Sequence, residues 1–225
     1  MILANQVDVW TPNSIPGLVA WMDARYPSDF TLAAAKVTRW ANHGGSGGAN
    51  WDVTDAGVAA NRPTYTSGIS VDFDGIANHL VSGAITLKEP YTLLLKAQIN
   101  TGFAANTYIL DGRVNNTGAI YNGASVNHII TMFNGVNFSS GQWQWFVDKP
   151  FRVGTVFSDD SSNLQVCGYT RVQGDAGNGA DRSGWTLGSS GGAAQFLIGS
   201  IFWVLLYDNP LNNNRFDEIF YNMPI

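Results

Sequence analysis

The sequence predicts an all-β protein, namely a two-sheet antiparallel jelly-roll sandwich with one short C-terminal helix. Three observations support this class. Apolar residues recur mostly at every second position in short runs, and Gly, Asn, Asp, Ser and Pro residues bound these runs, which is the pattern of strands and turns. Only 13% of the residues are charged, against about 25% in ordinary soluble domains. A charge-rich helical bundle is therefore disfavoured.

The length of the chain suits a single domain. With 225 residues, of which 45% are hydrophobic, the chain can bury one continuous core of the size that β-sandwiches reach. We therefore expect residues 1–225 to form one jelly-roll domain, with residues 1–14 as a candidate N-terminal arm.

Individual strands are predicted from alternation along the chain. In residues 91–99 the apolar side chains share one face, while Thr92, Lys96 and Gln98 share the other, which predicts a half-buried strand. Residues 30–40 fit either a short helix or a strand, because their spacing favours neither. The predicted strands cover residues 69–73, 91–99, 107–111, 128–133, 142–146, 151–157, 164–169, 185–188 and 196–207.

The last predicted strand is unusually long and leads into the helix. We expect a bend or bulge near Gly199 and Ser200, because a missing side chain lets a strand turn between sheets. Its nearly all-apolar second half predicts a central strand that is covered on both faces. Asn212 and Asn213 are candidate N-caps of the helix. An apolar stripe at i, i+3, i+4 and i+7 then comprises Phe216, Ile219, Phe220 and Met223.

Charge and cysteine content exclude several partners. The net charge is −5 and the 12 Lys and Arg residues are scattered singly, which argues against nucleic acid and against a polybasic membrane patch. Cys167 is the only cysteine, so neither an intrachain disulfide nor a cysteine-based metal site can form. The first 17 residues lack the features of a secretory signal, and no run is long enough to span a membrane.

Several motifs in fixed order resemble the concanavalin A-like, laminin-G-like jelly-roll superfamily, in the form common in bacterial surface proteins and bacteriophage virion proteins. They are IPGLVAWMDA, KVTRWANHGGSGGANW and ANRPTY in the first third of the chain, then ISVDFDG, and finally SDDSSNLQVCGYTRV, WTLGSSGG and IGSIFWVLLYDNPLNNNRFDEIFYNM. The resemblance implies the same jelly-roll fold across nearly the whole chain. Trp203 and Val204 stand where this family's ending usually carries an acidic residue, which counts against an inherited calcium site.

The resemblance implies a virion surface protein, such as a head decoration, head fibre or tail fibre component. In this interpretation the protein is located on the virion, its partners are other virion proteins and a host surface polysaccharide, and it forms a homo-oligomer. We expect no signal peptide, since a protein released by host lysis would need none. Two alternatives stay open, a cell-surface or secreted carbohydrate-binding module and a polysaccharide-degrading enzyme.

The content of acidic residues argues against a polysaccharide-degrading enzyme. Glycoside hydrolases of this fold resemble one another in a strand carrying the pattern E-x-D-x-x-E, whose two Glu residues act as nucleophile and acid/base. Glu89 and Glu218 are the only Glu residues here, and they lie far apart in the chain. We therefore expect no catalytic residues and a protein that is not an enzyme.

Four tryptophans are the candidate ligand-binding residues, because an indole face can stack on the C–H face of a sugar ring. They lie near loops rich in Gly and Asn, and packing in the core or at a subunit interface is the competing explanation. Because the chain has so few charges, we expect the ligand to be a neutral polysaccharide. The four are Trp51, Trp143, Trp145 and Trp185.

Calcium is the one candidate cofactor, since acidic side chains at turn positions offer the hard oxygen ligands that this ion takes. The competing explanation is that Asp and Asn simply favour turns. The candidate ligands are Asp159, Asp160, Asp175 and Asp181.

Overall fold

The computed structural model describes residues 11–113, 117–124, 128–179, 181–191 and 194–223. Within these residues it contains 17 strands, paired antiparallel throughout, and one α-helix, α1 (Asn213–Asn222). This confirms the prediction of an all-β protein with one C-terminal helix. In the described part of the chain, no helix is long and apolar enough to cross a membrane.

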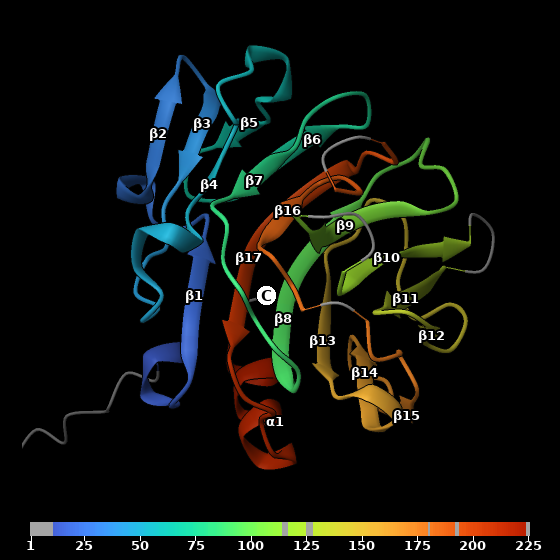
Figure 1. Ribbon diagram of the computed structural model, residues 1–225. Coiled ribbons are helices and arrows are strands. Elements are labelled where there is room, and N and C mark those ends of the chain that lie inside the picture. Colours follow the sequence, from blue (N-terminus) through green and yellow to red (C-terminus); the bar gives the residue numbers. More distant parts are fainter. Residues whose placement is uncertain (1–10, 114–116, 125–127, 180, 192–193, 224–225) are drawn as a thin grey trace, which may run out of the picture.

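Two runs of neighbouring strands make up the architecture (Figure 1). In the first run the order is β15, β14, β13, β8 and β17, after which β17 pairs with β6 over residues 198–201 and with β1 over residues 203–207. β5 continues the run beyond β6. The bounds are β1 (Leu18–Asp23), β5 (Thr64–Thr66), β6 (Ser70–Asp74), β8 (Tyr91–Ile99), β13 (Phe151–Phe157), β14 (Ser162–Val166), β15 (Val172–Gly174) and β17 (Ile198–Tyr207).

The second run follows the order β2, β3, β4, β7, β16, β9, β10, β11 and β12. It meets the first run where Lys36 of β3 pairs with Thr64 of β5. All strands therefore belong to one continuous, strongly curved sheet in place of two separate sheets. The bounds are β2 (Phe30–Ala33), β3 (Lys36–Trp40), β4 (Val53–Thr54), β7 (Leu80–Ser82), β9 (Thr107–Gly112), β10 (Ala119–Ala124), β11 (Ile129–Phe133), β12 (Asn137–Ser139) and β16 (Trp185–Leu187).

The main core lies inside this curved sheet. Alternate residues of both runs point inward, so that Leu93 and Leu95 of β8 share one cluster with Leu110 of β9 and Leu187 of β16. Each is fully buried, and burying a leucine contributes about 1.5–3 kcal/mol. The two runs are thus held together by their shared core as well as by strand pairing.

A second core lies on the outer face, beneath α1. Trp203, Leu205 and Tyr207 of β17 pack there with Leu94 of β8 and with the apolar stripe of α1, which comprises Phe216, Ile219, Phe220 and Met223. In the predicted two-sheet sandwich, the Trp203, Leu205 and Tyr207 face would meet the Tyr91–Ile99 face across the main core, and the structure shows that this is wrong. β8 and β17 are hydrogen-bonded neighbours in one sheet, so their side chains share faces and do not oppose each other.

Some predictions of individual strands and of the helix cap are confirmed, and one predicted strand is wrong. Residues 91–99 and 151–157 form strands with the predicted bounds, and Asn212 caps α1 by accepting a hydrogen bond from the Arg215 N–H at 3.0 Å. β17 is central and buried, with its bulge between Ile201 and Trp203, two residues beyond the expected glycine. Residues 30–40 form a β2–β3 hairpin. Residues 142–146 form a turn segment and no strand, with Trp143 at φ +59°.

Candidate functional site

Three of the four candidate tryptophans belong to the core. Trp51, Trp145 and Trp185 are buried. The Trp185 indole N–H donates to the Trp51 carbonyl at 3.3 Å, and the Trp145 ring stacks on the His128 ring with centroids 4.6 Å apart. A buried indole cannot offer a face to a sugar, so these three candidates are corrected to packing residues.

Trp143 alone of the four is open to solvent, with half of its surface (50%) exposed. Its backbone carbonyl accepts a hydrogen bond from the Tyr169 hydroxyl at 3.5 Å. This contact places the Trp143 turn beside the loop that follows β14.

The four candidate calcium ligands are not brought together. The Asp159 N–H donates to the Glu89 carboxylate at 2.8 Å, and the Asp160 carboxylate accepts from the Ser161 hydroxyl at 2.9 Å. Asp175 accepts from the Gly177 N–H at 2.7 Å, while Asp181 lies 3.8 Å from the Lys88 ammonium. Among the residues that the structure describes, no group of three or more His, Cys, Asp or Glu side chains could hold a metal ion.

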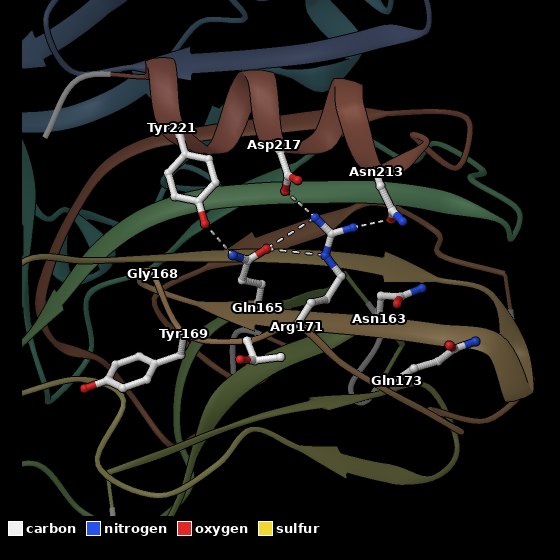
Figure 2. A pocket seen from close by; sticks show the side chains of 10 residues that line it. Asn163, Gln165, Gly168, Tyr169, Arg171, Gln173, Asn213, Asp217 and Tyr221 are labelled. Atoms are coloured by element: carbon white, nitrogen blue, oxygen red, sulfur yellow. Dashed lines mark hydrogen bonds and ion pairs between the residues drawn. The ribbon is translucent and has the colours of Figure 1, made fainter.

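A polar hollow lies between α1 and the strands β14 and β15 (Figure 2). We call it the Arg171 groove. Its volume is about 460 Å³. It is lined by Asn163, Gln165, Gly168, Tyr169, Thr170, Arg171, Gln173, Asn213, Asp217 and Tyr221.

Local structure explains why these side chains converge. In β14, Leu164 and Val166 point into the main core, so Asn163 and Gln165 point outward. On α1, residues at i, i+4 and i+8 lie on one side of a helix, and Asn213, Asp217 and Tyr221 therefore face the strands together. Figure 2 shows this row of helix side chains above Gln165 and Arg171.

Arg171 organises the groove. Its guanidinium donates to Asp217 at 2.5 Å, to Asn213, and to the Gln165 amide oxygen at 3.3 Å from two of its nitrogens. The guanidinium carbon also lies 4.0 Å from the centre of the Phe216 ring. The Gln165 amide nitrogen in turn donates to the Tyr221 hydroxyl at 3.0 Å. The charges of Arg171 and Asp217 cancel, so the groove is close to neutral and its polar groups are held rigidly.

A smaller hollow of about 290 Å³ shares Gly168 and Tyr221 with the groove. We call it the Lys96 pocket. It is lined by Lys96, Pro150, Phe151, Arg152, Cys167, Gly168 and Tyr221. Burial, together with the positive charges of Arg152 and Arg25, lowers the pKa of Lys96, while Asp23 acts in the opposite direction. Burial also raises the pKa of the Cys167 thiol.

The sequence contains two rows of polar residues that indicate this site, but we selected tryptophans as the candidate ligand-binding residues instead. Asn213, Asp217 and Tyr221 form a polar row at spacing four, next to the apolar stripe that predicted α1. Asn163 and Gln165 alternate with apolar residues in the same way. Only the packing of α1 against β14 joins these two rows into one groove.

Comparison with known proteins adds information about the fold. No family model and no curated protein matches the chain. Trypanosoma rangeli sialidase in complex with sialic acid has a similar structure, with a TM-score of 0.59 and 15% identity over 91% of this chain and 32% of that chain. A mutant of NanB sialidase from Streptococcus pneumoniae has a TM-score of 0.50 and 15% identity over 70% of this chain and 28% of that chain.

These likenesses show the fold, and the chain spans about a third of the length of the sialidase chains. Sialidases are enzymes, and this fold occurs within them, so our expectation from residue content of a protein that is not an enzyme is overturned. Neither neighbour is a virion protein. The comparisons therefore give no support to the virion interpretation.

Proposed function

We propose that this chain is a carbohydrate-binding domain and that the Arg171 groove holds the glycan. The observation that carries the proposal is a rigid, neutral and solvent-open polar network with exposed aromatic rings at its edge. Sugars present many hydroxyls, each a donor and an acceptor, and also apolar C–H faces. A site for them needs fixed amide and carboxylate groups together with an aromatic surface.

The network leaves several polar atoms available to a ligand. Among the described residues, the Gln173 side chain has no hydrogen-bond partner, and Asn163 uses only its amide nitrogen, which donates to the Ser161 carbonyl at 3.1 Å. Asp217 uses one carboxylate oxygen for Arg171. Because Arg171 already holds its neighbours in place, a bound sugar would immobilise few side chains, which reduces the entropy lost on binding.

Aromatic surface lies on both sides of these polar atoms. Tyr169 is 45% exposed and Tyr221 is 53% exposed, and both line the groove from different elements. The Tyr169 hydroxyl connects the groove to the Trp143 turn, which extends the aromatic surface outward. Exposed aromatic side chains that gather beside a groove often mark a binding site, and a sugar face fits this arrangement.

The structural neighbours are consistent with this proposal. The names of the two sialidases describe proteins that act on a glycan, and one of them was captured with sialic acid. We propose a place on a cell surface or outside the cell, where glycans are displayed. A single open groove of this kind would bind in the millimolar to micromolar range, about −4 to −8 kcal/mol, and several copies would strengthen attachment.

A glycan array followed by calorimetry on the best ligand tests the proposal. Gln173→Ala and Tyr169→Ala remove exposed groups that line the groove, and each is expected to weaken binding at least tenfold while leaving the fold intact. Two matched controls should bind normally. Asn214→Ala changes an exposed residue in the first turn of α1 that does not line the groove, and Ile76→Ala changes an exposed residue far from it. Analysis of the glycans after incubation shows whether they are also cleaved.

Two results would contradict the proposal. One is the absence of glycan binding even when the protein is displayed in many copies on a bead. The other is binding that survives both groove substitutions, since the glycan site would then lie elsewhere on the chain.

A further inference from the structure

Lys96 carries a charge that its surroundings do not balance. The residue is only 8% exposed. Among the described residues its ammonium makes no hydrogen bond or ion pair, and it lies 4.4 Å from the centre of the Phe202 ring. Buried lysines are normally paired with an acid, because removing an ammonium from water is costly.

The residue opposite Lys96 makes the imbalance larger. Arg152 of β13 is the direct cross-strand partner of Lys96 of β8, and like charges in this position repel. Arg152 donates to the backbone carbonyls of Phe220 at 3.0 Å and of Met223 at 2.7 Å, at the C-terminal end of α1. These carbonyls supply only part of a negative charge.

Among the described residues, no nearby acid completes the balance. Asp23 attracts Lys96 from β1, but it is already held by the Arg25 guanidinium at 2.5 Å. Three cations, namely Lys96, Arg152 and Arg25, thus face one carboxylate, that of Asp23. No described Asp or Glu lines the Lys96 pocket, whose remaining walls are Pro150, Phe151, Cys167, Gly168 and Tyr221. Asp23 and Arg25 line a second hollow on the other side of Lys96, together with Phe202.

The position of this excess charge matters because the Lys96 pocket adjoins the Arg171 groove. Gly168 and Tyr221 line both hollows, so one ligand can extend from the neutral polar groove into the cationic pocket. A cationic pocket with partly apolar walls suits a compact anion attached to a larger neutral body. Ion pairing with Lys96 would also relieve its repulsion by Arg152.

We propose that the glycan held by the Arg171 groove is acidic, and that its carboxylate or sulfate group enters the Lys96 pocket and pairs with Lys96. This inference rests on the proposed carbohydrate-binding function. It departs from the neutral polysaccharide expected from the composition, because the low overall charge of the chain does not reveal two cations that the fold brings together.

Calorimetry with matched sugars tests the inference. The probes are glucuronic acid against glucose, galactose 6-sulfate against galactose, and N-acetylneuraminic acid against its methyl ester. For at least one pair the acidic member is expected to bind at least tenfold more tightly than the neutral member. The pair that shows this preference distinguishes a uronic acid, a sulfated sugar and a sialic acid as the source of the anion.

Three variants separate the two proposals. Lys96→Met should remove the preference for the acidic sugar and leave the neutral member bound as before, and Lys96→Arg should keep the preference. Gln173→Ala should weaken both members of a pair equally. Equal binding of acidic and neutral sugars by the wild-type protein, or a preference that survives Lys96→Met, overturns this inference and leaves the proposed function standing. Failure of all sugars to bind overturns both.

Discussion

Trp143 and Trp203 show that burial determines how much a tryptophan contributes to the free energy of unfolding. Trp203 is 2% exposed and packs under α1, whereas Trp143 is half exposed on the turn whose backbone contacts Tyr169. Trp203→Ala should lower the free energy of unfolding by about 3–5 kcal/mol, because it leaves a cavity in the outer core. Trp143→Ala should change it by less than about 0.5 kcal/mol. Urea unfolding of both variants checks this, and equal effects would contradict the assigned environments.

The pH dependence of stability should reveal the unbalanced charge of Lys96. The folded-state pKa of Lys96 is lowered, chiefly by burial, so the folded protein binds this proton less tightly than the unfolded chain does. Lys96 therefore costs stability at neutral pH, and the cost disappears as the pH rises from the lowered folded pKa through the unfolded value of about 10.4.

Lys96→Met is accordingly expected to be more stable than the wild-type protein at pH 7, with a difference that shrinks as the pH approaches about 10. Urea unfolding of both proteins across this range gives the difference directly, and other titrating groups cancel in it. A variant that is less stable than the wild-type protein at pH 7 would mean that the ammonium has a partner.

At the scale of the elements, α1 contributes both to the stability of the fold and to the glycan affinity of the Arg171 groove. It covers the outer core with one side and lines the Arg171 groove with another. Asn212→Ala removes the side-chain cap of its first turn and should cost about 0.5–2 kcal/mol. Because Asn213 and Asp217 follow in the same turns, glycan affinity should fall as well. Thermal unfolding and calorimetry measure both effects, with Asn214→Ala as the control. Loss of stability without loss of affinity would show that α1 does not position the site.

At the scale of the whole molecule, the continuous sheet predicts cooperative unfolding. Trp21 and Trp203 lie in the first run of strands, and Trp40 and Trp185 lie in the second, so fluorescence reports on both runs. Because the runs share the main core, tryptophan fluorescence and far-UV circular dichroism should give the same urea midpoint. Two separated transitions would show that the runs are independent folding units. The homo-oligomer expected from the sequence remains a prediction, which sedimentation velocity can test.

The sequence by itself determined the features that depend on neighbours along the chain. Alternation predicted β8 and β13 with their bounds, and the apolar stripe with its capping asparagine predicted α1. The position of Trp203 in an apolar strand predicted its burial. These features follow from local geometry, since a strand repeats every two residues and a helix every 3.6.

Only the tertiary structure decided which faces meet and which side chains reach solvent. Alternation shows that β17 has two apolar faces but does not say which face α1 covers, and it cannot separate exposed Trp143 from buried Trp145. The groove combines β14, β15 and α1, and the like-charged Lys96 and Arg152 lie 56 positions apart in the chain yet opposite each other on paired strands. Such pairings depend on strand order and register, which are set by the packing of the whole chain and not by any local pattern.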